Sequence, residues 1–279
     1  MRKRLVARIA LAGCAALLAA GYGPVSVALH DPHDLPALAQ DARVHYEANA
    51  KGYAEAVAKL LPAATARVEA AQGRPFGRPF VVAAYLDEDA YALANGLGSS
   101  KARGVTYFDR VAMSPTLWRE EPEYLEADLV HELSHEHLWG HLSAVDYFQI
   151  PVWFVEGLAV TVSNGGGAQR VSIEEAEREI VAGHAIDTPD EAYFFGNLGL
   201  NPPPPRLEDE DPRLRMHMAY RQAGLFVSFL RAQNRQGFKS LLDRLTTGER
   251  FKPAFEASFG AGVTAMREGF LRAVAASAS

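Results

Sequence analysis

The stretch "HELSHEHLWGH", residues 131–141, holds four of the chain's nine histidines and two glutamates within eleven positions. His131 and His135 are four residues apart, which on a helix corresponds to about 40° of rotation and one turn of rise. Both imidazoles therefore project from one face of the predicted helix, close enough to hold a single cation. Glu132 lies beside that face and can reach a water on the metal without being a ligand.

This arrangement is typical of metal-assisted hydrolysis. Zinc lowers the pKa of a bound water to about 7, and a neighbouring carboxylate can take its proton. A catalytic zinc needs a third protein ligand and an open fourth position. The extended pattern H-E-x-x-H-x-x-G-x-x-H is not completed, because Leu138 stands where it needs Gly, although His141 occupies its last position. We therefore look for the third ligand downstream.

The stretch "PVWFVEGLA", residues 151–159, supplies a candidate in Glu156, which apolar residues flank on both sides. A buried carboxylate without a partner is costly, so Glu156 needs a cation or a hydrogen-bond donor. By itself it could also be a carboxylate near the start of a helix. We predict that one Zn²⁺ is held by His131, His135 and Glu156, with Glu132 as the general base.

"HELSH" followed by "PVWFVEGLA" resembles the gluzincin metallopeptidases, specifically the peptidase MA-like group. In that group the Glu of a W-x-x-E-G-x-A helix is the third zinc ligand. The resemblance covers about residues 75–275 and implies that "WFVEGLAVTVS", residues 153–163, is a helix. The valine content of that segment alone favours a buried strand. The spacer, residues 136–155, is slightly longer than in thermolysin or the zinc aminopeptidases.

A second match begins at Tyr220. "YRQAGLFVSFL" is similar to the aminopeptidase segment in which a Tyr donates its phenol to the oxyanion of the tetrahedral intermediate. Tyr220 also falls on an apolar helical stripe, a position that is equally typical of a core residue. The other members of the stripe are Met216, Ala223, Val227 and Leu230. Both roles stay open for Tyr220.

Four further polar residues stand near these motifs. His137 is about 200° around the helix from His135, and neither it nor His141 shares the ligand face, so a surface or structural role is expected for both. Asp128, one turn before His131, could orient a ligand, although a solvated acid is the more common role. For His217, one turn before Tyr220, a structural role is expected.

Residues 1–29 have the features of an export signal. "MRKRLVAR" carries four basic residues and no acid, and the run Ile9–Leu29 contains no charge. Such a segment is either cleaved or kept as a membrane anchor through residues 9–29. "LAGC" also resembles a lipoprotein signal that would lipidate Cys14, or Cys14 is simply buried in the apolar part of the signal. We expect a periplasmic, secreted or membrane-anchored protein.

The composition limits the possible metal ligands and partners of the protein. Cys14 is the only cysteine, so the exported part can form no disulfide within the chain and has no thiolate ligands. Four of the 28 basic residues fall in the first 29 residues, whereas all 34 acidic residues lie beyond them. The chain beyond residue 29 is therefore acidic, and nucleic-acid binding is not expected. We expect a peptide or protein substrate; the sequence carries no indication of an oligomeric state.

The pattern along the chain predicts an α+β fold, with a small sheet followed by a zinc-binding helix pair and a helical body. Residues 30–72 are expected to be helical, with Pro62 separating two helices. A domain is expected over residues 73–279, divided into a sheet, the zinc helices and the helical body (73–115, 116–168 and 169–279).

Within that domain, "FVVAAYL" (80–86) predicts a strand and "GVTYFDRVAMS" (104–114) a hairpin that turns at Asp109 and Arg110. By the gluzincin resemblance, the hairpin would supply the edge to which an extended substrate pairs. A helix is expected from Pro122 to about Trp139, ended by Gly140. A turn at "NGGG", a helix at "SIEEAEREIVAG", an extended loop at "NPPPPRLEDEDP" and further helices complete the pattern.

The function predicted from these residues is that of an exported zinc metallohydrolase, most simply a peptidase. The alternatives are a non-catalytic zinc-stabilised binding protein on the same scaffold and a zinc hydrolase of non-peptide substrates. Glu132 argues against a purely structural site, which has no need of that carboxylate. The sequence lacks a G-x-M-E-N segment for binding a free amine, which favours an endopeptidase.

Overall fold

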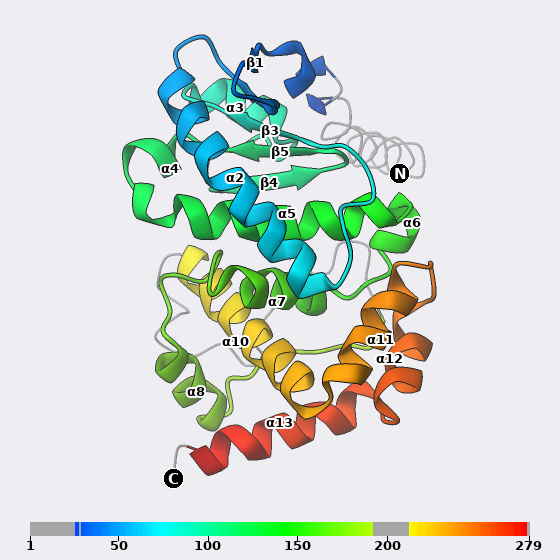
Figure 1. Cartoon of the computed structure of the whole chain (residues 1–279). Helices are drawn as coiled ribbons and strands as arrows, with labels where there is room; N and C mark the ends of the chain where they lie inside the picture. Colours follow the sequence, from blue (N-terminus) through cyan, green and yellow to red (C-terminus); the bar gives the residue numbers. More distant parts are fainter. Residues whose placement is uncertain (1–25, 28, 192–211, 278–279) are drawn as a thin grey trace, which may run out of the picture. The chain divides into compact units, whose positions relative to one another are not determined.

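The computed structural model describes residues 26–27, 29–191 and 212–277 (Figure 1). The expected export signal with Cys14, and most of the loop expected at residues 201–212, lie outside these ranges. Within them, no helix combines the length and the apolar character that crossing a bilayer would require.

The chain forms two compact units. The first contains the described residues up to Lys59 together with Phe80–Glu123, and the second contains Leu60–Pro79 and the described residues from Tyr124 onward. Helix α2 contributes to both, because the boundary falls within it. The expected domain boundary at residues 72 and 73 stays a prediction.

The first unit is built on a mixed five-stranded sheet with the order β1-β2-β3-β5-β4. β3 pairs in parallel with β2 and β5, whereas the outer pairs β1–β2 and β4–β5 are antiparallel. The strands are β1 (Ala37–Leu38), β2 (Asp41–Tyr46), β3 (Val81–Ala84), β4 (Gly104–Tyr107) and β5 (Arg110–Met113). The sheet and the helices together make the fold α+β, as predicted.

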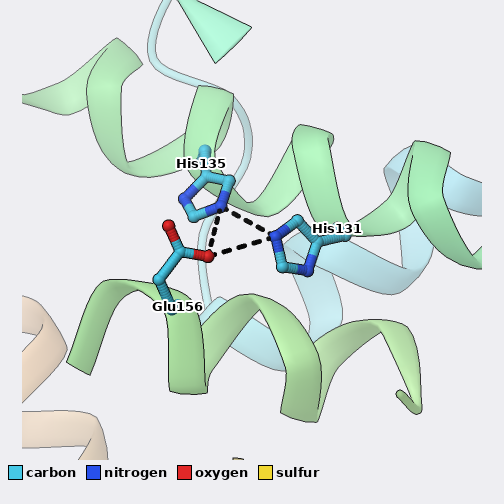
Figure 2. A group of neighbouring side chains, drawn as sticks. All are labelled: His131, His135 and Glu156. Carbon is cyan, nitrogen blue, oxygen red and sulfur yellow. Dashed lines mark hydrogen bonds and ion pairs between the residues drawn. The ribbon is translucent and has the colours of Figure 1, made fainter. Parts of the chain in front are cut away.

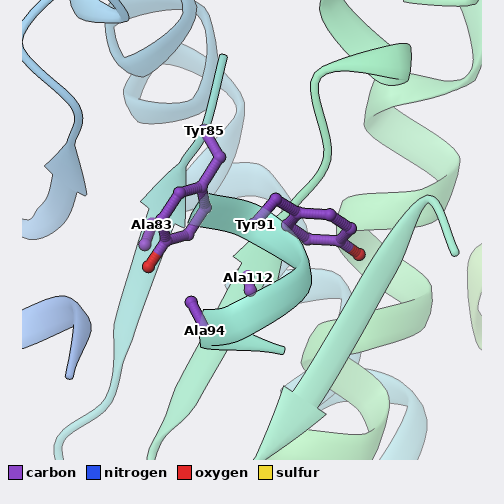
Figure 3. Close-up of a cluster of buried hydrophobic side chains, with 5 residues drawn as sticks. All are labelled: Ala83, Tyr85, Tyr91, Ala94 and Ala112. Carbon is purple, nitrogen blue, oxygen red and sulfur yellow. The ribbon is translucent and has the colours of Figure 1, made fainter. Parts of the chain in front are cut away.

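The central strand β3 is buried along its whole length, as its continuous apolar sequence predicts. Helix α3 (Glu88–Ala94) packs against it, and Asp87 caps α3 by accepting the N–H of Ala90. Figure 3 shows the resulting cluster, in which the rings of Tyr85 and Tyr91 lie 5.9 Å apart among three alanines. The alanines are Ala83, Ala94 and Ala112.

The hairpin β4–β5 is present, but its turn is one residue earlier than expected. Arg110 pairs with Tyr107, so Phe108 and Asp109 form the turn. Phe108 has a φ of 57°, in the left-handed region that bulky residues rarely adopt. β4 is an edge strand of the sheet.

The prediction that residues 30–72 are helical is wrong for the residues before Lys51. A short 3-10 helix (Pro32–Asp34) and strands β1 and β2 come first, and the β-branched and aromatic residues of "RVHY" favour the pairing of β2 with β3. From Lys51 to Gln72 the chain is one helix, α2, with Pro62 inside it rather than between two helices.

Short helical segments link the sheet to the second unit: α4 (Thr116–Arg119) and a 3-10 turn (Pro122–Tyr124). In the second unit α5 continues through Gly140 to His141, so Gly140 does not end it. The segment around Glu156 is a helix, α7, as the gluzincin resemblance implied and against its β-propensity. The helices of this unit are α5 (Leu125–His141), α6 (Ala144–Tyr147), α7 (Val152–Ser163), α8 (Ile173–Val181), α10 (Pro212–Gln233), α11 (Arg235–Leu245), α12 (Phe251–Phe259) and α13 (Val263–Ser277).

Helices α7 and α10 cross in close contact, because each carries a glycine at the crossing. A Cβ on Gly157 would lie 2.5 Å from the carbonyl oxygen of Ala223, and one on Gly224 would lie 2.6 Å from Val160 Cγ1. The apolar stripe of α10 faces this contact, with one exception. Met216, expected on the stripe, is 43% exposed.

Candidate metal centre

Helices α5 and α7 pack side by side within the second unit and carry the predicted ligands (Figure 1). Every residue of α5 from Asp128 to Trp139 is buried, including its acids and histidines. Buried polar groups need hydrogen-bond or ionic partners, so this helix must be matched by polar groups from its neighbours.

His131, His135 and Glu156 meet at one point (Figure 2). Glu156 Oε2 lies 3.3 Å from His131 Nε2 and 3.4 Å from His135 Nε2, and the two Nε2 atoms are 3.1 Å apart. The side chains of the three residues are 6%, 10% and 17% exposed, in the same order. This buried group could bind a metal ion, and it contains all three ligands predicted from the sequence.

Interactions within this group strongly shift the pKa values of His131 and Glu156. Burial would lower the pKa of His131, but the hydrogen bond and the charge of Glu156 outweigh it and raise that pKa to about 9. Burial would raise the pKa of Glu156, but the two imidazoles hold it well below its ordinary value. Glu156 is therefore an anion at neutral pH, the form in which a carboxylate binds a cation.

The outer nitrogen of His131 is held by the turn that follows α7. The helix ends at Asn164, which adopts the left-handed conformation with φ 58°, and the turn continues through three glycines. His131 Nδ1 donates to the carbonyl oxygen of Gly166 at 2.9 Å. Since Nδ1 is taken by this hydrogen bond, Nε2 is the nitrogen directed at the cluster, and it would bind a metal once its own proton is displaced.

The outer nitrogen of His135 faces a tyrosine that sequence reasoning did not select. Tyr147 Oη lies 3.4 Å from His135 Nδ1. Burial, together with the charges of Glu156, Glu132 and Glu136, raises the pKa of Tyr147 well above its ordinary value, so the phenol stays protonated.

Glu132 is buried one residue after His131. Its charge contributes to raising the pKa values of His131, Tyr147 and Tyr220. The carboxylate therefore acts electrostatically on the same small region as the ligand cluster, yet it does not belong to the group of three ligand atoms that converge. Glu132 therefore lies near the candidate ligands without belonging to them.

Tyr220 lies against the cluster on its α10 side. Its ring stacks on His131 with the centroids 6.0 Å apart and the planes 12° from parallel. Burial, then the charge of Glu156 and a hydrogen bond to it, raise the pKa of Tyr220 well above its ordinary value. The phenol thus keeps its proton and can act as a hydrogen-bond donor beside the cluster.

Four residues near the motifs were expected to have no part in metal binding, and the structure confirms a structural role for only some of them. His137 and His141 have structural roles, donating from Nε2 to the carbonyl oxygens of Arg74 at 2.9 Å and Pro75 at 3.0 Å. His217 is buried. The expectation of a solvated Asp128 is wrong: it is 3% exposed and accepts the N–H of Gly167 at 2.9 Å.

Comparison of the chain with protein-family models, curated proteins and solved structures found no match. The geometry of the second unit therefore carries the functional interpretation.

Sequence reasoning missed Tyr147 and the backbone carbonyl of Gly166. Neither shares a motif with the ligands: Tyr147 lies twelve residues beyond His135, and Gly166 lies 35 residues beyond His131. The only available signal was the run "NGGG", whose glycines indicate a tight backbone close to another group.

Proposed function

We propose that this protein is a zinc metallohydrolase, and most simply a peptidase of the gluzincin type. The observation that carries the proposal is the spacing of the three ligand atoms, 3.1 to 3.4 Å. Ligands at about 2.0–2.1 Å from a tetrahedral zinc are separated by about 3.3 Å. His131, His135 and Glu156 would thus hold the ion and leave one position open, as in catalytic sites.

Zinc, when bound, would supply Lewis-acid activation of a water molecule, bringing the pKa of that water to about 7. Glu132 would accept the proton of the attacking water and pass it to the leaving amine. Tyr220, protonated and beside the cluster, would donate a hydrogen bond to the oxyanion that develops on the scissile carbonyl.

Two features support a peptide as the substrate. The sequence resembles the gluzincins at "HELSH" and "PVWFVEGLA", and the helix that this resemblance implies around Glu156 is α7. Residues 1–29 further support export of the protein, so we propose that it acts outside the cytoplasm, free or anchored.

The test uses the purified chain and its Glu132→Gln variant. We expect about one zinc per chain by mass spectrometry in both proteins. The wild type should cleave members of a peptide library, and a chelator should stop cleavage. The variant should lose hydrolysis, because the amide cannot accept the proton. Glu126→Gln, an exposed acid in the first turn of α5, is the matched control and should retain full activity.

The outcomes separate the alternative functions. Zinc binding without cleavage of any peptide would point to the zinc-stabilised binding protein, or to a hydrolase of other substrates if an ester or amide probe is cleaved. Loss of zinc in Glu132→Gln would show that Glu132 is a ligand and not the base. Peptide cleavage that survives complete metal removal would contradict the proposal.

A further inference from the structure

The turn after α7 is anchored from two sides. We define the glycine loop as residues 164–169, "NGGGAQ". Two of its glycines have positive φ, 105° at Gly165 and 76° at Gly167, a backbone that other residues adopt only with strain. Glycine adopts such a backbone without strain but also adopts many others, so the groups around the loop decide which conformation it keeps.

The first anchor comes from α5. Asp128 Oδ1 accepts the backbone N–H of Gly167 at 2.9 Å and also the side-chain amide of Gln169. Asp128 is buried, and hydrogen bonds to a buried ionised acceptor are stronger than those between neutral groups. The carboxylate therefore ties the loop to the same helix that carries His131, one turn away.

The second anchor comes from α10. Arg221 donates from Nε to the carbonyl oxygen of Val171 at 2.9 Å and from Nη2 to that of Ala168 at 3.0 Å. Its guanidinium also packs on the loop backbone, since a Cβ on Gly165 would lie 2.9 Å from Nη1. The loop is thus held from α10 as well as from α5.

The held loop contacts His131 at two adjacent ring atoms, Nδ1 and Cε1. The carbonyl oxygen of Gly166 accepts from Nδ1, and a Cβ on Gly167 would lie 2.7 Å from Cε1. The loop leaves space for the imidazole in this orientation and supplies the acceptor that keeps it there.

We propose that the glycine loop is a positioning device for His131, and that Asp128 and Arg221 set the zinc affinity of the site through it. Neither residue is a ligand. This inference rests on the proposed function, because it assigns a task to residues around the same zinc site. Loss of a group that orients a metal-binding histidine lowers metal affinity by about 10- to 100-fold.

The test measures zinc dissociation constants by competition with a chelator of known affinity. Asp128→Ala should weaken zinc binding about 10- to 100-fold. Asp128→Asn removes the charge but keeps an acceptor oxygen for Gly167 and Gln169, so it should weaken binding by less than about 10-fold. Arg221→Met should weaken binding about 10-fold or more, while Arg235→Met, an exposed arginine at the start of α11, should change nothing.

The absorption spectrum of the cobalt-substituted protein gives a readout independent of activity, since its visible bands report ligand geometry. The bands should shift in Asp128→Ala and Arg221→Met but not in Arg235→Met. Circular dichroism of the metal-free proteins shows which variants fold, and if Asp128→Ala does not fold, Arg221→Met decides.

Wild-type zinc affinity and spectrum in the folded variants would overturn the positioning role and leave the proposed function standing. Equal weakening in Asp128→Asn and Asp128→Ala would also overturn it, because the charge and not the hydrogen bond would then be responsible. A wild-type chain that binds no zinc would overturn both proposals.

Discussion

His131 and His135 use their two ring nitrogens for different tasks. In each, Nε2 faces Glu156, while Nδ1 faces a neutral oxygen: the Gly166 carbonyl for His131 and the Tyr147 hydroxyl for His135. Binding of a metal through both Nε2 atoms would leave each Nδ1 to carry the proton that faces this oxygen. At the residue scale, the site therefore consists of three candidate ligands and of the groups that contact their outer nitrogens.

Glu156→Ala tests the third ligand. It removes the anion that lies within 3.4 Å of both imidazoles, so zinc content should fall from about one per chain to a small fraction. Mass spectrometry after dialysis measures it. Glu126→Ala, which removes an exposed charge, should keep its zinc. Full zinc retention in Glu156→Ala would show that Glu156 is not a ligand.

Tyr220→Phe tests the oxyanion donor. Removing the phenol should lower kcat about 10²-fold with zinc content unchanged, the size expected for loss of such a donor. Tyr147→Phe offers a comparison, because its hydroxyl contacts the outer nitrogen of His135. It should have the smaller effect on kcat. Unchanged kcat in Tyr220→Phe would make Tyr220 a core residue, the role that its place on the apolar stripe also allowed.

At the scale of elements, the crossing of α7 and α10 brings Glu156 and Tyr220 to the same site. The crossing is close only because Gly157 and Gly224 lack side chains at the contact. Gly157, the residue after Glu156, allows α7, which carries the candidate ligand Glu156, to approach α10, which carries Tyr220.

Gly157→Ala tests the crossing. The added methyl would meet the carbonyl of Ala223 at 2.5 Å, so the helices must move apart. We expect a loss of about 1–3 kcal/mol in the free energy of unfolding, measured in urea, together with weaker zinc binding. In Gly269→Ala on α13 the nearest atom would be 3.7 Å away, and helix propensity should raise stability by up to about 1 kcal/mol. Equal stability of the two variants would contradict the close crossing.

At the scale of the whole chain, every residue of the candidate site belongs to the second unit, which combines Leu60–Pro79 with the chain from Tyr124 onward. Residues 73–79 are tied to the C-terminal half of α5 by hydrogen bonds from His137, His141 and Arg78. Arg74 further forms an ion pair with Asp243 on α11. Segments far apart in the sequence are thus joined around the helix that carries the ligands.

This arrangement predicts a dependence of stability on pH. Burial lowers the pKa of His137 to about 4, although its hydrogen bond to the Arg74 carbonyl opposes the shift. In the unfolded chain the pKa is about 6.5, so between pH 6.5 and 4 the unfolded state binds more protons. The free energy of unfolding should therefore fall by roughly 2–4 kcal/mol as the pH decreases through this window.

Urea unfolding in the presence of a chelator, from pH 7 to pH 4, measures this dependence. In His137→Gln the amide can still donate to the Arg74 carbonyl but does not titrate. Its stability should fall less steeply with decreasing pH than that of the wild type. Parallel curves for the two proteins would show that His137 is not the group responsible.

Much of the site could be predicted from the sequence because the positions of its candidate ligands depend on residues close to them in the chain. Four residues of helix place His131 and His135 on one face whatever surrounds them, and the apolar residues around Glu156 require a partner for its carboxylate. The same local rules predicted β3 and the helix α8. They were wrong for β2, where pairing with β3 outweighed the neighbouring helix formers.

The sequence by itself thus determined which three residues could hold a metal and most of the helices and strands beyond residue 80, since these follow from spacing and hydrophobic pattern. The tertiary structure decided which groups lie behind the candidate ligands: the Gly166 carbonyl, Tyr147 and, through the glycine loop, the buried Asp128. These contacts depend on how α5, α7 and α10 pack and on where the loop between them turns. No spacing along the chain encodes that packing, because the hydrogen-bond partners become neighbours only when the helices have come together.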